Sequence, residues 1–417
     1  MLDTVAPLPG RAAEAGPAYG ARMSARARAI CGVLLVLACV PVWTGGLALS
    51  FATQVMIMIV LAQSFQILLG EAGLLSFGHA AYSGLGAFAA AHVLNVAGAQ
   101  QWPLPTPLLP IVGALAGAAG GATLGWFATR RGGIAFAMIT LGTGELLATG
   151  AAAWPDTFGG EGGIATDRTY GWSPVDLGSS RHVYVLIAIW AVLSVIAMRA
   201  FARTPLGLAA NAVREQPRRA AFVGFDVRRV RYRTLIVSAG FAGVAGALST
   251  LASEHVSADA FGLAQSGAIL VAVVMGGALG WGGPLVGTVL YVGFAMVLAT
   301  LTRAWPFYLG LMFVAVVSLA PRGLIGLRQT MRARPPLRRL VGAALLVCAI
   351  VLGVEMLYRL TLAADSGTTL AGFGLTIDAT STTAWAGAAG LFLAGLALMM
   401  VRLNRDPGGT ADARAES

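Results

Sequence analysis

Residues 199–233 read RAFARTPLGLAANAVREQPRRAAFVGFDVRRVRYR and form a basic segment between two long apolar stretches. Nine of these residues are arginine, against two acidic ones, Glu215 and Asp226. An arginine at the centre of a membrane-spanning helix costs about 2.5–3.5 kcal/mol even on the mildest scale, so the segment has to face water. Because positively charged loops accumulate on the cytoplasmic side of membranes, we expect a cytoplasmic loop here.

The middle of the basic segment has helical character. Leu208, Ala212 and Val213 are spaced to share one helical face, and Pro217 then breaks the pattern. A short helix lying flat on the cytoplasmic face of a membrane domain is a surface for a partner.

Composition indicates a membrane protein. The 417 residues are 57% hydrophobic and only 11% charged, and the mean hydropathy is +0.77. The 55 glycines are scattered through apolar stretches, as close helix packing in lipid requires. Cys31, Cys39 and Cys348 fall inside predicted spans without disulfide or zinc spacing. The net charge of +10 comes from arginines at the ends of apolar stretches, which favours membrane topology over nucleic-acid binding.

The expected fold is an all-α integral membrane protein, a polytopic bundle of about 10–12 transmembrane helices. The predicted spans are near 30–46, 48–69, 72–96, 108–129, 133–153, 182–200, 234–253, 266–280, 284–302, 305–320, 340–360 and 382–401. Glycines and Pro284 separate the spans near 266–280 and 284–302, so one of these two helices is expected to be broken or re-entrant.

The arginines give the orientation. With the N-terminal tail 1–29 and the C-terminal tail 403–417 in the cytoplasm, 24 of the 28 arginines lie inside. Four lie outside: Arg168, Arg181, Arg303 and Arg359. This asymmetry predicts that both termini are cytoplasmic.

Several enzyme motifs are absent from the sequence. It has no G-x-x-x-x-G-K-[ST] loop for ATP, no H-E-x-x-H and no G-x-S-x-G, and its four histidines lack metal-ligand spacing. We therefore expect a transport component without catalytic residues, metal or cofactor of its own. The alternative is an ion-coupled secondary transporter, which would carry several buried charges; Glu145 is the plain candidate.

Seven motifs, taken in their order along the sequence, point to a particular family. They are GEAGLLSFGHAAYSGLGAFAA (70–90), FAMITLGTGELL (136–147), GGEGGI (159–164), RTPLGLAANAVREQPRRAAFVGFDV in the basic segment, SAGFAGVAGAL (238–248), MGGALGWGGPLVG (275–287) and APRGLIGL (320–327). Together they resemble the membrane permease subunits of branched-chain amino acid ABC importers, closest to the larger of the two permease types.

The resemblance implies a permease domain over 30–330, with the type II importer-like fold and an additional pair of helices over 331–402. It implies a bacterial inner-membrane subunit that works with a second permease, cytoplasmic ATPase subunits that bind ATP and Mg²⁺, and a periplasmic solute-binding protein. Related permeases serve branched-chain amino acids, urea, short amides or aromatic acids, so the substrate stays open.

In this family the basic segment would dock into the ATPase. The coupling candidates are Pro205, Gly207, Ala212, Arg214, Glu215, Arg218 and Gly224. The plainer alternative is that the arginines only fix topology. Leu208 stands where relatives usually carry an arginine, which leaves a specific salt bridge there in doubt.

Four polar residues within the spans are candidates for the substrate pathway: Ser76, His79, Thr140 and Glu145. Glu145 lies near mid-bilayer and either meets the ammonium group of a substrate or bonds a neighbouring helix. His79 is more simply explained as a packed, hydrogen-bonded residue, and Thr140 as bonded to its own helix. The pairs Ala239/Gly243 and Ala242/Gly246 predict close helix packing.

Overall fold

The computed structural model describes residues 46–278, 280–302, 304–319, 323–324, 337–361, 369–372, 375–378 and 381–400. It divides into two compact units, with the boundary between Val292 and Gly293 inside helix α12 (Gly283–Leu301). The predicted tails 1–29 and 403–417, and the span near 30–46 up to residue 45, lie outside the described residues.

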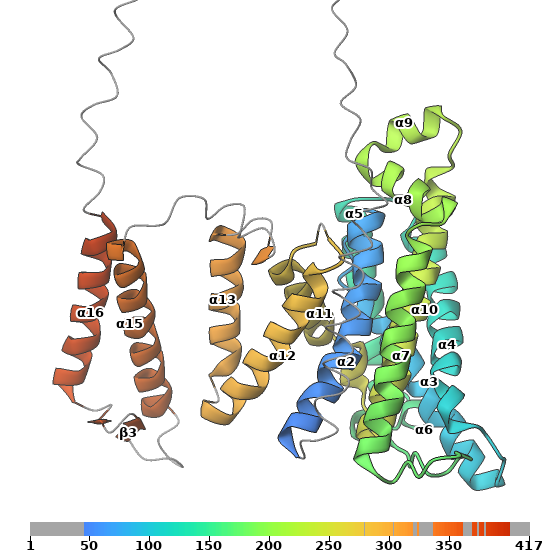
Figure 1. Cartoon of the computed structure of the whole chain (residues 1–417), viewed down its shortest axis with the longest axis horizontal. Helices are drawn as coiled ribbons and strands as arrows, with labels where there is room; N and C mark the ends of the chain where they lie inside the picture. Colours follow the sequence, from blue (N-terminus) through green and yellow to red (C-terminus); the bar gives the residue numbers. More distant parts are fainter. Residues whose placement is uncertain are drawn as a thin grey trace, which may run out of the picture. The chain divides into compact units, whose positions relative to one another are not determined.

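The first unit is a helical bundle. Its long elements are α2 (Leu47–Gln66) with its π-helical continuation η1 (Ile67–Glu71), α3 (His79–Gln100), α4 (Leu109–Ala128), α5 (Ile134–Ala153), α7 (Ser180–Phe201), α10 (Val227–Ser253), α11 (Leu263–Gly276) and the first part of α12. The short elements are η2 (Thr106–Leu108), α6 (Pro155–Phe158), η3 (Gly160–Gly162), β1 (Ile164–Ala165), α8 (Pro205–Glu215), α9 (Pro217–Phe222), β2 (His255–Val256) and η4 (Ala258–Phe261). Helices α8 and α9 lie at one end of this bundle and α6 at the other (Figure 1).

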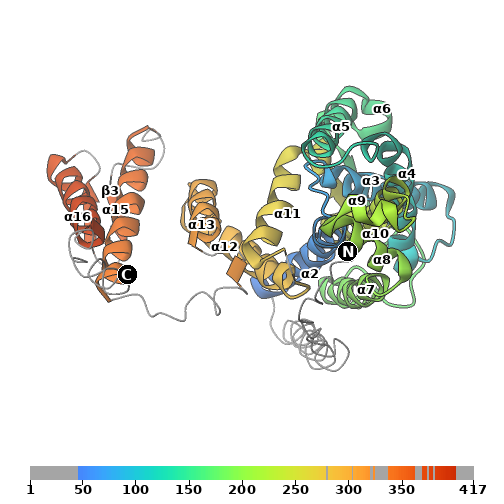
Figure 2. The same cartoon turned by 90° about the horizontal axis from the view of Figure 1, so that it is seen from above.

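Helix α10 lies at the centre of the first unit, against α4, α3 and α2 (Figure 2). Glycines bring these helices together. A Cβ on Gly243 would lie 2.9 Å from the carbonyl carbon of Gly113 and 3.0 Å from the Cα of Gly117, both on α4. A Cβ on Gly246 would lie 2.9 Å from the backbone nitrogen of Ala87 on α3. The predicted packing role of these small residues is confirmed.

Helix α11 is too short to cross a bilayer. Its 14 residues rise about 21 Å, whereas the hydrocarbon core is about 30 Å thick. Its first residue, Leu263, is hydrogen-bonded to Glu145, the twelfth residue of the spanning helix α5. The helix therefore begins at the level of the middle of α5, which agrees with the predicted broken or re-entrant element.

The second unit contains the end of α12, α13 (Trp305–Leu319), α15 (Leu337–Thr361), β3 (Thr369–Gly372), β4 (Leu375–Asp378) and α16 (Thr382–Met400). Helices α15 and α16 pack together, and β3 pairs antiparallel with β4 between them in sequence. The polar segment between the last two predicted spans thus contains a hairpin that the sequence did not indicate.

Among the described residues, seven helices are long and apolar enough to cross a membrane, and four shorter apolar helices accompany them. All eleven coincide with predicted spans. Two predicted helix starts differ most from the structure. Helix α3 begins at His79 rather than near 72, because residues 72–78 form turns and irregular backbone, with Gly73 at φ +66°. Helix α10 begins at Val227, because the Asp226 carboxylate accepts a hydrogen bond from the Arg229 backbone N–H at 3.0 Å and caps it. The last arginines of the basic segment therefore belong to a helix rather than a loop.

Candidate functional sites

The first candidate site is the pair of short helices in the basic segment. Thr204 caps α8 by accepting a hydrogen bond from the Gly207 N–H at 3.3 Å, and Pro205 occupies the first helical position. Pro217 lacks an N–H and begins a new helix, α9, so the predicted break is confirmed. After α9, Gly224 adopts φ +100°, a conformation that favours glycine.

Helix α8 has a buried face and an open face. Gly207, Ala209, Ala210 and Val213 are buried, and a Cβ on Gly207 would approach the Phe201 carbonyl oxygen to 2.5 Å. Leu208, Ala212 and Glu215 are exposed. The prediction that Leu208 and Ala212 share a face with Val213 was therefore wrong. The spacings of three and four residues that link Leu208, Ala212 and Glu215 define a separate stripe.

Large apolar side chains gather on the open side of the basic segment. Phe222 is 90% exposed, Val223 78% and Leu208 62%. The coupling candidates Pro205, Ala212, Glu215, Arg218 and Gly224 are all exposed as well. Large apolar side chains left this exposed, in a segment rich in arginine, are candidates for a protein–protein contact. We call the set Leu208, Phe222 and Val223 the docking patch.

Arg214, in contrast, points toward the helical bundle. Its guanidinium Nη1 donates to the carbonyl oxygen of Gly70 in η1, and its side chain packs against Gly73, where a Cβ would lie 2.6 Å from the Arg214 Cγ. One turn earlier, the Asn211 side-chain amide donates to Glu71 Oε2 at 3.3 Å. Helix α8 is thus tied by polar contacts to the π-helical end of α2, a type of irregularity that is frequent at functional sites.

The same end of α2 holds the turn between α11 and α12. Trp281 Nε1 donates to Glu71 Oε1 at 3.2 Å. The amides of Gln63 and Gln66 donate to the carbonyl oxygens of Trp281 and Ala278 at 2.8 and 2.5 Å. Glu71 therefore joins α8, α2 and the turn before α12 through its two oxygens. No local pattern points to this role of Glu71, because its partners are 140 and 210 residues away in the chain.

The second candidate site is a polar centre around the beginning of α3. His79 is fully buried, and its Nε2 lies 2.9 Å from Ser64 Oγ. The Ser64 hydroxyl donates to the Leu61 carbonyl oxygen at 2.7 Å, which assigns the hydrogen to His79 Nε2. The imidazole packs edge-on against Phe65 and Tyr82, with centroids 5.3 and 5.9 Å away. His79 is thus packed and hydrogen-bonded, with Nδ1 lacking a hydrogen-bond partner among the described residues.

Thr140 and Ser76 lie in the same region. Thr140 Oγ1 donates to Ala137 O at 2.9 Å in its own helix and accepts from the Phe77 N–H at 3.2 Å. Ser76 is buried, and its Oγ has no hydrogen-bond partner within the described part of the chain. The structure therefore brings Ser76, His79 and Thr140 together where α3 begins, whereas Glu145 lies further along α5.

Glu145 belongs to an open stripe of α5. Met138, Gly142, Glu145 and Thr149 are all exposed, and at 100° per residue they fall within about 60° of one another. A Cβ on Gly142 would meet nothing within 4 Å. The Glu145 Oε1 accepts from the Leu263 N–H at 3.2 Å, so the carboxylate lies at the positive end of α11. Only Glu145 of this stripe was predicted.

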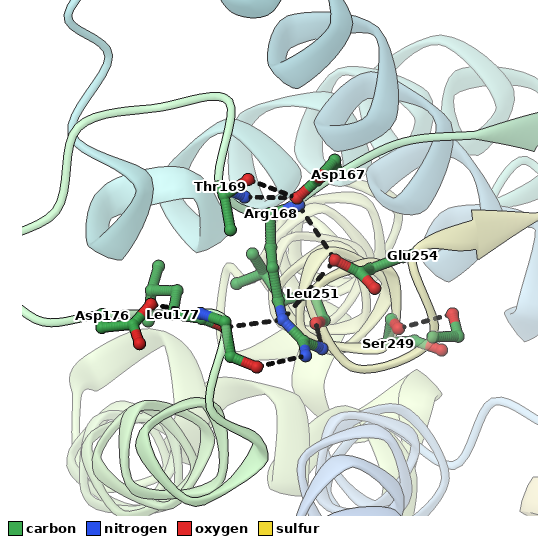
Figure 3. Close-up of polar contacts among 10 residues, drawn as sticks. Asp167, Arg168, Thr169, Asp176, Leu177, Ser249, Leu251 and Glu254 are labelled. Atoms are coloured by element: carbon green, nitrogen blue, oxygen red, sulfur yellow. Dashed lines mark hydrogen bonds and ion pairs between the residues drawn. The ribbon is translucent and has the colours of Figure 1, made fainter.

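At the opposite end of the bundle from α8, the polar loop after α5 is held by Arg168 (Figure 3). Its Nε donates to Leu177 O at 2.7 Å and lies 3.5 Å from Glu254 Oε1. Its two terminal nitrogens donate to the carbonyl oxygens of Leu251 and Gly178 at 3.4 and 3.3 Å. Beside it, hydrogen bonds from the Thr169 hydroxyl and N–H hold the pKa of the Asp167 carboxyl below its ordinary value of 3.8. The loop is thereby fixed to the end of α10.

Comparison with known proteins identifies the family of this chain. Residues 47–320 match the family described as "Branched-chain amino acid transport system / permease component". The chain is 29% identical over 335 residues to the high-affinity branched-chain amino acid transport system permease protein LivM of Escherichia coli K12, covering 75% of this chain and 76% of that protein. It is 28% identical over 320 residues to LivM of Salmonella typhimurium LT2, covering 71% and 73%. No solved structure matches the chain.

Proposed function

The chain belongs to the family of branched-chain amino acid transport system permease components, and from that premise we propose that it is the permease subunit of an ATP-driven importer for branched-chain amino acids. It would form the translocation path with a second permease in the bacterial inner membrane, with both termini cytoplasmic. A periplasmic solute-binding protein would deliver the substrate. ATP and Mg²⁺ would bind to cytoplasmic ATPase subunits rather than to this chain. The family match favours this function over an ion-coupled secondary transporter.

The open stripe of α5 is the observation that carries the proposal. A membrane helix facing lipid along this stripe would expose the Glu145 carboxylate and the Thr149 hydroxyl to hydrocarbon, which is costly for the charged group. A water-filled path beside a second permease removes that cost. In such a path Glu145 would attract the ammonium group of an amino acid, while its bond to the Leu263 N–H keeps α11 in place.

The docking patch supports the contact with the ATPase. Helix α8 is fixed to the bundle by Arg214 and Asn211, so a displacement of α8 would pull on η1 and, through Glu71, on Trp281 before α12. The ATPase would displace α8 at the docking patch. The contacts of Glu71 would transmit this displacement to η1 and to the turn before α12. Ser76 Oγ and His79 Nδ1, whose hydrogen-bonding capacity is unused within the described chain, would become available to a substrate if this movement opened the beginning of α3.

Affinity purification of the tagged chain from gently solubilised membranes tests the proposal. We expect an ATPase and a second permease to co-purify with the wild-type chain. Phe222→Asp together with Val223→Asp should remove the ATPase and leave the second permease, because both side chains are exposed and neither supports the bundle. Arg214→Gln is the matched control and should retain the ATPase, since this side chain points inward. Purification of the wild-type chain alone would contradict the proposal.

A further inference from the structure

A tryptophan stands between two arginines at the end of α4, on the same end of the bundle as the beginning of α10. Trp126 is 54% exposed. The guanidinium carbon of Arg228, in the first turn of α10, lies 4.7 Å from its ring centroid, and that of Arg130 lies 5.7 Å away. Both distances are within the range of a cation–π contact. Tyr232 completes the corner, edge-on to Trp126 at 5.9 Å.

The corner is rich in uncompensated positive charge. Arg130 and Arg228 form no ion pair with a carboxylate among the described residues. The nearby Asp226 is already paired with Arg229 at 3.0 Å. Arg231 packs against Gly132, and its Nε is buried without a hydrogen-bond partner in the described chain. The arginines therefore present several donors to one small area and lack an anion there.

An apolar stripe leads from this corner along α4. Ile111, Leu115, Ala119 and Trp126 are exposed, and at 100° per residue they fall within about 80° of one another. The glycines Gly113, Gly117, Gly121 and Gly125 occupy the other side and pack against α10. Unlike the open stripe of α5, this stripe has no charged residue before the corner. It is suited to face hydrocarbon.

We propose that the Trp126 corner binds an anionic phospholipid. The phosphate accepts hydrogen bonds from Arg130 and Arg228, the indole lies at the depth of the headgroup, and the acyl chains follow the apolar stripe of α4. Tryptophan prefers the membrane–water interface, and arginines near an anionic leaflet are attracted to its headgroups. The charge and the adjoining apolar stripe together require a ligand with both an anionic head and hydrocarbon chains, which distinguishes a lipid from free phosphate.

Native mass spectrometry of the full chain in a mild detergent tests this site. Phosphatidylglycerol, phosphatidylcholine and inorganic phosphate are each titrated against the wild type, the double variant Arg130→Gln/Arg228→Gln, and Arg229→Gln. The last variant is the matched control, because Arg229 lies next to Arg228 but is paired with Asp226. We expect tight phosphatidylglycerol adducts on the wild type and on Arg229→Gln, with binding weakened about tenfold or more in the double variant.

A second measurement covers the case in which the double variant does not fold. Brominated phosphatidylglycerol quenches nearby tryptophans, and the difference between wild type and Trp126→Phe isolates the signal of Trp126. The single variant Arg228→Gln, whose side chain is exposed, should lose most of that signal. Equal binding of phosphatidylcholine, equal loss in Arg229→Gln, or saturation by inorganic phosphate alone would each overturn the proposal. Displacement of the lipid when a partner subunit associates would assign the corner to a protein contact instead and would also overturn it.

Discussion

Helices α10 and α5 are both membrane spans, yet they are packed very differently. Both are long and apolar enough to cross a membrane, whereas 67% of the apolar stretch of α10 and only 28% of that of α5 is buried. Helix α10 uses its small residues to bring α3 and α4 close. Helix α5 has small residues too, but Gly142 and Gly150 have nothing within 4 Å of a Cβ.

The difference teaches that similar apolar sequences serve two purposes. In α10 the glycines allow backbone contact within the subunit, so their surroundings are complete. In α5, Gly142 leaves space on the side that carries the Glu145 carboxylate and the Thr149 hydroxyl, and no described residue fills it. The proposed second permease and the path between the two subunits would cover this side of the helix.

The largest effect on stability is expected from a larger side chain at a closely packed glycine of α10. Gly243→Leu places a side chain against the backbone of Gly113 and Gly117 and should destabilise the protein by about 3 kcal/mol or more. The matched change Gly142→Leu on the open stripe should leave the fold intact. Thermal unfolding of the two purified variants measures this. A similar loss in both would show that α5 is packed as tightly as α10.

The open helix should respond in transport rather than in stability. Glu145→Gln keeps an oxygen that accepts from the Leu263 N–H but removes the charge. We expect uptake by the assembled importer to fall about tenfold, equivalent to about 1.4 kcal/mol, with an unchanged melting temperature. Glu145→Asp, which retains the charge, is the comparison. Full uptake by Glu145→Gln would leave this residue with its structural contact to α11 alone.

The link between α8 and the bundle should affect coupling. Arg214→Gln breaks the contact with Gly70 but leaves the docking patch untouched. The complex should therefore still hydrolyse ATP, while the amount of substrate imported per ATP falls about three- to tenfold. Arg233→Gln, at an exposed position on α10, is the control. An unchanged ratio of transport to hydrolysis would remove Glu71 and Arg214 from the coupling route.

The smallest effect is expected at the polar loop after α5, which Arg168 holds against the end of α10. Because the pKa of Asp167 is lowered by Thr169, this pair stabilises the loop above the ordinary pKa of 3.8 and ceases to do so as the pH falls through the folded value. Thr169→Val should bring the pKa back toward 3.8 and reduce this acid sensitivity. Tryptophan fluorescence of the loop between about pH 2 and 5 measures it.

The spans were predicted well because length and hydropathy alone identify a membrane helix. Eleven of the expected spans correspond to helices in the described residues. The break at Pro217 and the packing role of Gly243 also follow from local chemistry. The start of α10 at Val227 was not predicted. Four arginines after an aspartate indicate a loop as long as their position at the end of a helical bundle is unknown.

The sites were predicted less completely. Arg214 was expected on the surface that meets the partner, but it turns inward to a carbonyl oxygen 144 residues earlier in the chain. Glu71 acquires its role from Asn211 and Trp281, which only the fold brings near. Thr149 lies outside the quoted motifs and Gly142 was not a candidate within its motif; both gain meaning only because the side of α5 that they share with Glu145 is open.

Uptake into proteoliposomes tests the central claim most directly. The chain is reconstituted with the second permease and the ATPase subunits, the solute-binding protein and radiolabelled leucine are added outside, and ATP is supplied on the side of the ATPase. We predict uptake that requires ATP and that proceeds without any ion gradient. Uptake by this chain alone, driven by a proton or sodium gradient and indifferent to ATP, would contradict the account.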